Sequence, residues 1–336
     1  MDKSLKYKPF KGIVVSFQKK YSNKYLDILS KFVDKYEIII KKKNLDFNKY
    51  RQIISKYSKL VVKHLKKPPK FEYFHKAIRS PIDYYQIGLD LFRPLIDFEN
   101  STLSGIENIC QMQAHIKKNE NIILFANHQI EADPQAISLL LENSFHDFAT
   151  KMIFIAGERV ITDGLAIPIS LGVNLFCIYS KKYFDVHKDK KDKMTNHNKE
   201  TILTIKKKLK KGGQCIYIAP SGGRDRMNKD GVVEVAPFDH QSIELFYILG
   251  KNSKVQTHFY PLALSTHDIM PPPDGIQIDL GEIRHTDEAP IHLSFGKELN
   301  MENFPGSDTT CRDLKKKLRR DYIYNIVCSM YNKFPN

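Results

Sequence analysis

The sequence predicts an α/β protein in which a mostly parallel, mixed sheet is flanked by helices and preceded by a small helical domain. Three observations support this fold class. Short apolar runs alternate with helical patterns after about residue 71, which is typical of parallel strands joined by helices. Two amphipathic helical patterns precede that region. Between the two parts stands Lys67-Pro68-Pro69, which ends a helix and marks a boundary.

The first part is expected to be a helical domain over residues 1–70. Residues 20–37 and 47–66 each place their apolar side chains on one helical face and fill the other faces with Lys and Asp. We expect these two helices to pack against each other in antiparallel orientation.

The second part, residues 71–336, is expected to form the α/β domain. Helical segments around 84–97 and 104–118 lead into a strand at 121–126. Further strands are expected at 152–156, 175–179, 214–219 and 258–264, and further helices at 134–143, 195–211, 239–250 and 312–330. The charge-rich residues 181–198 are expected to form an exposed loop followed by a helix.

Composition indicates a soluble globular protein. The chain has 336 residues, of which 42% are hydrophobic and 27% charged. No stretch approaches the roughly 20 apolar residues that span a bilayer, and the N-terminus has no secretory apolar segment, so any transit peptide is expected to be removed or never present. The five cysteines are odd in number and lack a C-x-x-C pair. We therefore expect free thiols in a reducing compartment.

The net charge of +15 is concentrated near the N-terminus. Residues 1–70 contain 20 Lys or Arg and 5 Asp or Glu, whereas the remaining residues contain 33 of each kind. The first 70 residues are therefore expected to present an electropositive surface, suited to an acidic partner or to anionic lipid. A solvated lysine-rich face without a partner remains an alternative.

The pair with the clearest catalytic pattern is His128 and Asp133, which lie between the expected strand at 121–126 and the following helix. Asp133-Pro134 is a favourable helix start, with Asp as N-cap and Pro at the first helical position. His128 would then lie at the carboxyl end of a strand, where open α/β sheets bind ligands. An Asp that holds one imidazole nitrogen leaves the other nitrogen available as a general base.

A second loop, Ala219 to Arg226, follows the expected strand at 214–219 and so opens at the same edge of the sheet. Gly222 and Gly223 permit close approach of a ligand, and Arg224 and Arg226 present donor forks suited to phosphate. Lys181-Lys182 follows a third strand end and would complete an anion site. A base beside a phosphate anchor indicates a phosphorylated alcohol as substrate.

Metal chemistry is not expected at this site. A metal would need further His or Asp ligands on neighbouring strand ends, and only scattered candidates such as His258 and His267-Asp268 occur. We therefore predict no metal and no cofactor beyond the co-substrate.

The residues of these loops resemble a known family. Asn-His-Gln-x-Glu-Ala-Asp-Pro at 127–134 is similar to the motif of the soluble plastid-type glycerol-3-phosphate 1-O-acyltransferases, within the glycerolipid acyltransferase superfamily with its H-x-x-x-x-D motif. Further similar blocks occur in order from about residue 70 to 300: 74–77, 93–98, 157–172, 179–182, 218–226, 236–239, 260–261 and 267–273.

The resemblance implies the roles of individual residues. His128 would be the base and Asp133 its orienting partner, while Lys182, Arg224 and Arg226 would bind the phosphate of glycerol 3-phosphate. The family often has His where this chain has Tyr183, a phenol that still donates one hydrogen bond. The implied reaction is acyl transfer from a thioester of acyl carrier protein or CoA to the sn-1 hydroxyl, giving lysophosphatidate in phospholipid synthesis.

The resemblance also bears on partners and location. It implies an acidic acyl carrier protein as partner, with peripheral contact with an anionic membrane as a further expectation. The location would be a plastid stroma, including an apicoplast-like one, or a bacterial cytoplasm. Acylation of lysophosphatidate by the same His–Asp chemistry is the enzymatic alternative. A nucleic-acid-binding protein is the other, but no recognition-helix, RNP-type or zinc-finger pattern occurs, and we expect no nucleic acid partner.

Overall fold

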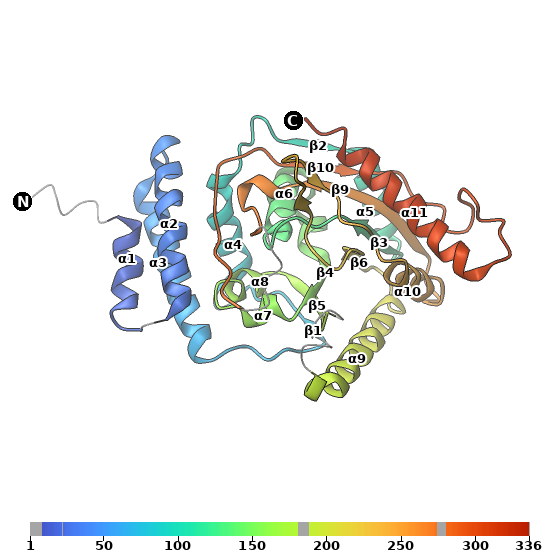
Figure 1. The fold of residues 1–336 in the computed structure, drawn as a ribbon, viewed down its shortest axis with the longest axis horizontal. Coiled ribbons are helices and arrows are strands. Elements are labelled where there is room, and N and C mark those ends of the chain that lie inside the picture. The colour runs from blue at the N-terminus through green and yellow to red at the C-terminus, as the bar shows by residue number, and fades with distance from the viewer. Residues whose placement is uncertain (1–8, 22, 181–187, 274–279, 336) are drawn as a thin grey trace, which may run out of the picture.

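The computed structural model describes residues 9–21, 23–180, 188–273 and 280–335. Within these ranges, eight strands form one mixed sheet in the order β1-β5-β4-β6-β3-β9-β10-β2 (Figure 1). The five central strands β5, β4, β6, β3 and β9 run parallel, β1 and β10 are antiparallel to their inner neighbours, and β2 is parallel to β10. The predicted fold class, a mostly parallel mixed sheet flanked by helices, is confirmed.

The strands are short and largely buried. Their bounds are β1 Phe74–His75, β2 Thr102–Ser104, β3 Asn121–Ala126, β4 Met152–Gly157, β5 Asn174–Ile178, β6 Cys215–Ile218, β9 Thr257–Ser265 and β10 His292–Phe295, and a separate hairpin pairs β7 Arg226–Met227 with β8 Val233–Glu234. Every residue of β3 is buried. A strand with both faces covered needs apolar side chains at successive positions, which is why β3 reads as a continuous apolar run.

The two faces of the sheet pack against different helices. Ile122 and Leu124 of β3 join a core with α4 Tyr84–Phe92, α5 Ile106–Lys117, α6 Asp133–Lys151, α8 Ile167–Ser170 and the N-terminal helices. Ile123 and Phe125 face the opposite way and join a core with α9 Lys191–Leu209, α10 His240–Lys251 and α11 Arg312–Tyr331. Alternate residues of a strand point to opposite faces, so one strand serves both cores.

The N-terminal helices are α1 Phe10–Gln18, α2 Lys24–Lys42 and α3 Phe47–Lys66, and Figure 1 shows them side by side at the left of the molecule. Their apolar faces are continuous with the first core. Polar contacts reinforce this packing: Tyr57 Oη donates to Leu165 O at 2.5 Å, and Lys43 Nζ donates to Ile96 O at 3.0 Å. The helices thus share a core with the α/β part, and a division into two domains at residue 70 stays a prediction.

Several expected elements have different bounds. The helix expected at 84–97 ends at Phe92 and continues as a 3-10 turn, Arg93–Leu95, because Pro94 cannot extend the α-helical hydrogen bonding. The helix expected at 134–143 runs on to Lys151, with a non-helical residue at Phe145. Helix α1 and strands β1, β2 and β10 were not expected at all. None of the helices in the described ranges is long and apolar enough to cross a bilayer.

Candidate active site

His128 and Asp133 meet at the carboxyl end of β3, as the sequence predicts. Nδ1 of His128 lies 2.7 Å from Oδ2 of Asp133. The imidazole is 31% exposed, whereas the carboxylate is 1% exposed. Because a carboxylate can only accept, Nδ1 carries the hydrogen and Nε2 of a neutral ring presents its lone pair. The pair therefore offers a fixed tautomer with one nitrogen available to a substrate.

Asp133 is held by three further donors. Its Oδ2 accepts from the backbone N–H of Gln129 at 2.9 Å, and its Oδ1 accepts from the N–H of Ile130 at 3.3 Å and from Oγ1 of Thr266 at 2.6 Å. The expected N-cap role is wrong: α6 begins at Asp133 itself, the N-cap position is Ala132, and no side chain caps the helix. The carboxylate turns back to the preceding loop, where it fixes His128 instead of the helix end.

A buried polar layer ties this loop to neighbouring strands. Asn127 Nδ2 donates to Oδ2 of Asp225 at 2.7 Å, and the N–H of Asp225 donates to the carbonyl of His128 at 2.6 Å. Gln129 Oε1 accepts from the N–H of Thr266, which follows β9, at 2.6 Å. Burial raises the pKa of Asp225 to about 6, although three N–H donors favour its carboxylate. The backbone around His128 is thus fixed from both sides.

Arg224 lies in the loop after β6 and Arg226 begins β7, at the same edge of the sheet as His128, but their guanidinium groups reach different partners. Both terminal nitrogens of Arg224 donate to the two carboxylate oxygens of Glu282, each at 2.7 Å. Nη1 of Arg226 donates to the carbonyl of Pro273. The structure therefore places Arg224 within a buried ion pair, whereas Arg226 contacts the segment that ends at Pro273.

Arg224 belongs to a charge-balanced cluster of three arginines and three carboxylates. Glu282 is also 4.0 Å from Nη1 of Arg159. Arg284 is buried, and its guanidinium contacts Oε2 of Glu131 at 2.8 Å and Oδ1 of Asp163 at 2.9 Å. The cluster consists of Arg159, Arg224, Arg284, Glu131, Asp163 and Glu282. Because Glu131 belongs to the same loop as His128, the cluster links the loop of His128 and Asp133 to the loop that carries Arg224.

Comparison with known proteins identifies the relatives of this arrangement. Residues 103–265, which span His128, Asp133 and both arginines, match the family model described as Acyltransferase. The match covers just under half of the chain. The predicted resemblance to the plastid-type enzymes is confirmed by the curated relatives.

Three of those relatives are named glycerol-3-phosphate acyltransferase, chloroplastic. The chain is 41% identical to the protein of Pisum sativum over 272 residues, 40% to that of Arabidopsis thaliana over 265 residues, and 39% to one of Cucurbita moschata over 270 residues. The matches cover 79–80% of this chain and 57–59% of the relatives, so the chain spans less than two thirds of their length. Among solved structures, a 1-acyl-sn-glycerophosphate acyltransferase of Thermotoga maritima aligns with a TM-score of 0.40 at 19% identity, over 73% of this chain and 77% of that one.

Two predicted site residues, Lys182 and Tyr183, lie outside the described residues. Conversely, sequence reasoning missed Glu282, Arg284 and Thr266. The distance along the chain explains this, since Glu282 is 58 residues from Arg224 and Thr266 is 133 residues from Asp133. Glu131 did offer a signal for a nearby cationic residue. It lies inside the motif but is not part of the His128–Asp133 pair, and an acidic residue that becomes buried there requires a cationic partner.

Proposed function

We propose that the chain is a glycerol-3-phosphate 1-O-acyltransferase. The observation that carries this proposal is the imidazole of His128, partly exposed at the sheet edge and fixed through Nδ1 to the buried carboxylate of Asp133. Arg224 and Arg226 on the same edge supply cationic groups for a phosphorylated substrate. These relatives are all named glycerol-3-phosphate acyltransferases, which supports the choice of substrate.

The reaction needs one general base and no covalent enzyme intermediate. Nε2 of His128 takes the proton of the sn-1 hydroxyl as its oxygen attacks the thioester carbonyl. The C–O bond forms, the C–S bond breaks, and the imidazolium returns the proton to the departing thiolate. Asp133 keeps the tautomer and stabilises the imidazolium. General-base assistance supplies about 10²–10⁴ in rate, and positioning through the phosphate supplies much of the rest.

Arg224 can serve a phosphate while it remains paired. A guanidinium has five N–H donors, and Glu282 uses two of them. Glu282 therefore holds the plane of Arg224 and removes most of its net charge, which sets how strongly a dianionic phosphate binds there. Arg226, Lys182 and Tyr183 complete the proposed phosphate site; Tyr183 would provide a phenolic hydrogen bond where the family often has His.

The acyl donor is proposed to be a thioester of acyl carrier protein, with acyl-CoA as an alternative donor, and the location a plastid stroma. The basic faces of α2 and α3, which include exposed Lys56 and Lys59, suit an acidic carrier because charge complementarity accelerates encounter. The same faces suit peripheral contact with an anionic membrane.

The activity is tested by steady-state acyl transfer with purified protein. We expect turnover with glycerol 3-phosphate, none with glycerol, and little with lysophosphatidate. His128→Ala should reduce kcat by about 10²–10⁴ while the far-UV circular dichroism spectrum is unchanged. His146→Ala is the matched control, because His146 is exposed on the same helix as Asp133. Near-normal turnover of His128→Ala would overturn the mechanism.

The phosphate role is tested separately. Arg224→Ala should raise the apparent KM for glycerol 3-phosphate with a smaller effect on kcat. Because that change leaves Glu282 buried without its partner, the double variant Arg224→Ala/Glu282→Ala serves as a control without an unpaired charge. An unchanged KM in both variants would remove Arg224 from the phosphate site.

The carrier surface is tested with charge reversals, since removing residues 1–70 would expose the shared core. Lys56→Glu/Lys59→Glu should raise KM for acyl carrier protein and weaken its salt dependence, with no change for acyl-CoA. Lys229→Glu/Lys317→Glu makes the same change in net charge at other exposed positions. Equal effects of the two pairs would show that overall charge, not a docking face, sets the KM.

A further inference from the structure

Four side chains from separate segments meet at the amino edge of the sheet, opposite the edge that carries His128. His115 lies in the last turn of α5, Glu120 immediately precedes β3, His258 is the second residue of β9, and Glu298 follows β10. These four residues are called the amino-edge cluster. They take no part in the proposed acyl transfer, and their convergence requires its own explanation.

The carboxylate of Glu120 fixes the tautomers of both histidines. The two rings are stacked, with centroids 3.5 Å apart and an interplanar angle of 28°. Oε2 of Glu120 lies 2.6 Å from Nδ1 of His115 and 3.0 Å from Nε2 of His258. Because the carboxylate only accepts, these two nitrogens carry the hydrogens, and neutral rings then present lone pairs at Nε2 of His115 and Nδ1 of His258.

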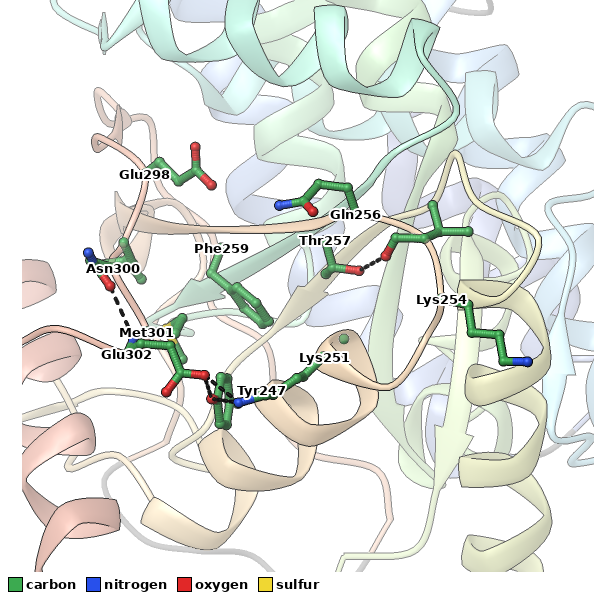
Figure 2. Close-up of a pocket in the computed structure, with 13 residues that line it drawn as sticks. Tyr247, Lys251, Lys254, Gln256, Thr257, Phe259, Glu298, Asn300, Met301 and Glu302 are labelled. Atoms are coloured by element: carbon green, nitrogen blue, oxygen red, sulfur yellow. Dashed lines mark hydrogen bonds and ion pairs between the residues drawn. The ribbon is translucent and has the colours of Figure 1, made fainter. Parts of the chain in front are cut away.

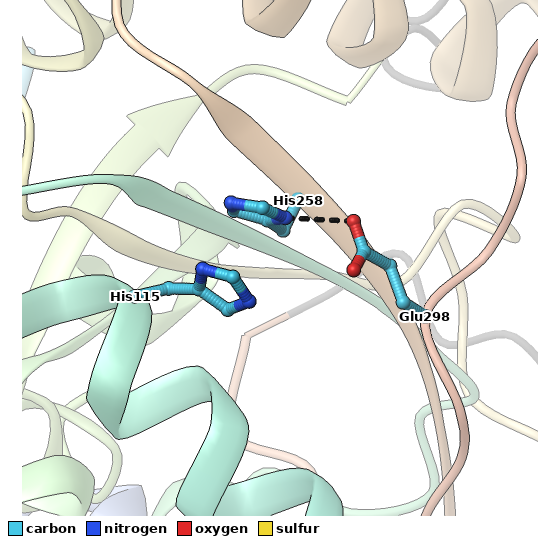
Figure 3. A group of neighbouring side chains, drawn as sticks. All are labelled: His115, His258 and Glu298. Carbon is cyan, nitrogen blue, oxygen red and sulfur yellow. Dashed lines mark hydrogen bonds and ion pairs between the residues drawn. The ribbon is translucent and has the colours of Figure 1, made fainter. Parts of the chain in front are cut away.

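Glu298 stands on the side of those lone pairs. Its Oε1 is 2.7 Å from Nδ1 of His258, and Figure 3 shows a nitrogen of each stacked ring turned toward it. One ligand atom from each of His115, His258 and Glu298 lies within 4.8 Å of the others. A carboxylate oxygen and a nitrogen lone pair at 2.7 Å repel each other, so Nδ1 of His258 carries an additional proton in this arrangement. A metal ion can displace that proton if the two side chains move slightly apart.

We propose that the amino-edge cluster binds one divalent transition-metal ion of the zinc type, with His115, His258 and Glu298 as ligands. Imidazole nitrogens and a carboxylate oxygen are ligands that Zn²⁺ accepts, at about 2.0–2.2 Å. Glu120 hydrogen-bonds the remaining nitrogen of both rings, which is the outer carboxylate that metal-binding histidines require. Binding tilts the stacked rings so that their lone pairs converge, and the partial exposure of His115, at 21%, leaves room for this movement.

Solvent reaches the cluster at Glu298, whose side chain is 44% exposed. Glu298 lines a pocket of about 670 Å³ beside the start of β9, together with Gln256, Thr257, Asn300 and Glu302 (Figure 2). A water molecule can complete a fourth position on the ion, as is usual where the protein supplies three ligands. The bound ion would join α5, β9 and the segment after β10, and so stabilise the amino edge of the sheet without entering the reaction.

The proposal is tested on the full chain, with any affinity tag removed and bound metal stripped by a chelator. Zinc chloride is titrated calorimetrically, and cobalt is substituted to give the visible absorption bands of a tetrahedral site. We expect one equivalent of Zn²⁺, a higher Tm with the metal, and loss of both signals in His115→Gln and Glu298→Gln. Glu120→Gln should weaken binding by about 10–100-fold, because it releases both ring orientations.

The controls separate a metal site from misfolding and from surface binding. His146→Gln removes an exposed histidine elsewhere, and it should leave stoichiometry and affinity unchanged. Metal-free His115→Gln should match the metal-free parent in circular dichroism and Tm, so that loss of binding reports the ligand. If the parent chain took up neither zinc nor cobalt, the proposal would be overturned, and the cation between His258 and Glu298 would be a proton. Unchanged binding in a His115→Gln/His258→Gln variant would overturn it too.

Discussion

Glu282 holds the guanidinium of Arg224 through two hydrogen bonds of 2.7 Å, so the arginine expected to bind phosphate is already paired with a carboxylate. The carboxylate side chain is 6% exposed and the arginine side chain 14% exposed, which makes this a buried pair. Buried pairs depend on both members, because either charge alone is costly to hold away from water. Glu282 thus has two effects at once: it orients Arg224 and it lowers the positive potential offered to a substrate.

Glu282→Gln separates these two effects. The amide keeps one acceptor for Arg224 but removes a negative charge beside the proposed phosphate site, so we expect KM for glycerol 3-phosphate to fall several-fold. The lost charge-assisted bond should also lower the free energy of unfolding by about 1–3 kcal/mol. Steady-state kinetics and urea unfolding measure the two quantities.

A control for Glu282→Gln comes from a second buried pair. Glu244 contacts Nη1 of Arg319 between α10 and α11. Glu244→Gln should lower stability in a similar way and leave KM unchanged. A higher KM in Glu282→Gln at unchanged kcat would instead assign to Glu282 a purely orienting role.

We expect Thr266 to be a positioning residue for the proposed catalytic pair, His128 and Asp133. Its hydroxyl donates to Oδ1 of Asp133 at 2.6 Å, opposite the oxygen that faces His128. Thr266→Val keeps the shape of the side chain and removes this donor. We expect kcat to fall about 10-fold, well below the roughly 10⁴-fold loss typical when the orienting Asp itself is replaced by Asn, while KM for glycerol 3-phosphate stays the same.

The matched control for this change is Thr286→Val. Thr286 is 1% exposed, and among the described residues its hydroxyl has no hydrogen-bond partner. Its replacement by Val therefore removes no donor from Asp133 and should change neither kcat nor KM. A kcat of Thr266→Val equal to that of Thr286→Val would show that Asp133 needs no support from the Thr266 hydroxyl.

The parts of the fold that sequence predicts are those specified by local pattern. The helix expected at 47–66 is found as Phe47–Lys66, and the strand expected at 121–126 is found as Asn121–Ala126. Both have strong periodicity or a continuous apolar run with clear end signals. Short strands such as β2 and β10 have no such run, and their pairing joins residues about 190 positions apart. That pairing is set by tertiary packing, which sequence periodicity does not encode.

The same distinction holds for the candidate site. His128 and Asp133 are five residues apart on one loop, so their contact follows from the strand-loop-helix pattern. The partner of Arg224 and the neighbours of His258 come from distant segments, and no local pattern indicates them. His258 was only a scattered candidate in the sequence, and the fold gives it two carboxylates and a stacked imidazole.

Thiol reactivity should divide the cysteines into two groups. Cys110 and Cys311 are exposed, whereas Cys177 in β5 and Cys215 in β6 are buried. Burial raises the pKa of Cys177 to about 12 and that of Cys215 further, so neither forms the reactive thiolate near neutral pH. A colorimetric thiol reagent should modify two thiols quickly in the folded protein and all five in denaturant.

Single replacements identify the fast thiols. Cys110→Ser and Cys311→Ser should each remove one fast equivalent, and the double variant should remove both. Cys328 is half-buried, and burial raises its pKa, so we expect it to react slowly. If Cys177→Ser had fewer rapidly modified thiols than the parent chain, the burial of Cys177 would be contradicted.

Asp225 should make stability depend on pH in the acidic range. Burial raises its pKa from 3.8 to about 6, so between about pH 4 and 6 the folded chain binds more protons than the unfolded chain. The free energy of unfolding therefore falls as the pH rises through this window, by about 1.4 kcal/mol for each pKa unit and on the order of 3 kcal/mol in all.

The measurement is urea unfolding at several pH values, in parallel for the parent chain and Asp225→Asn. An amide at 225 loses acceptor capacity at every pH, so the informative quantity is the change in the difference between the two proteins, which should shrink as the pH rises from 4 to 7. Asp230→Asn, at an exposed position in the neighbouring hairpin, should reproduce the profile of the parent chain. A difference between parent and Asp225→Asn that stays constant over this range would mean that the three N–H donors around Asp225 outweigh its burial and keep it ionised throughout.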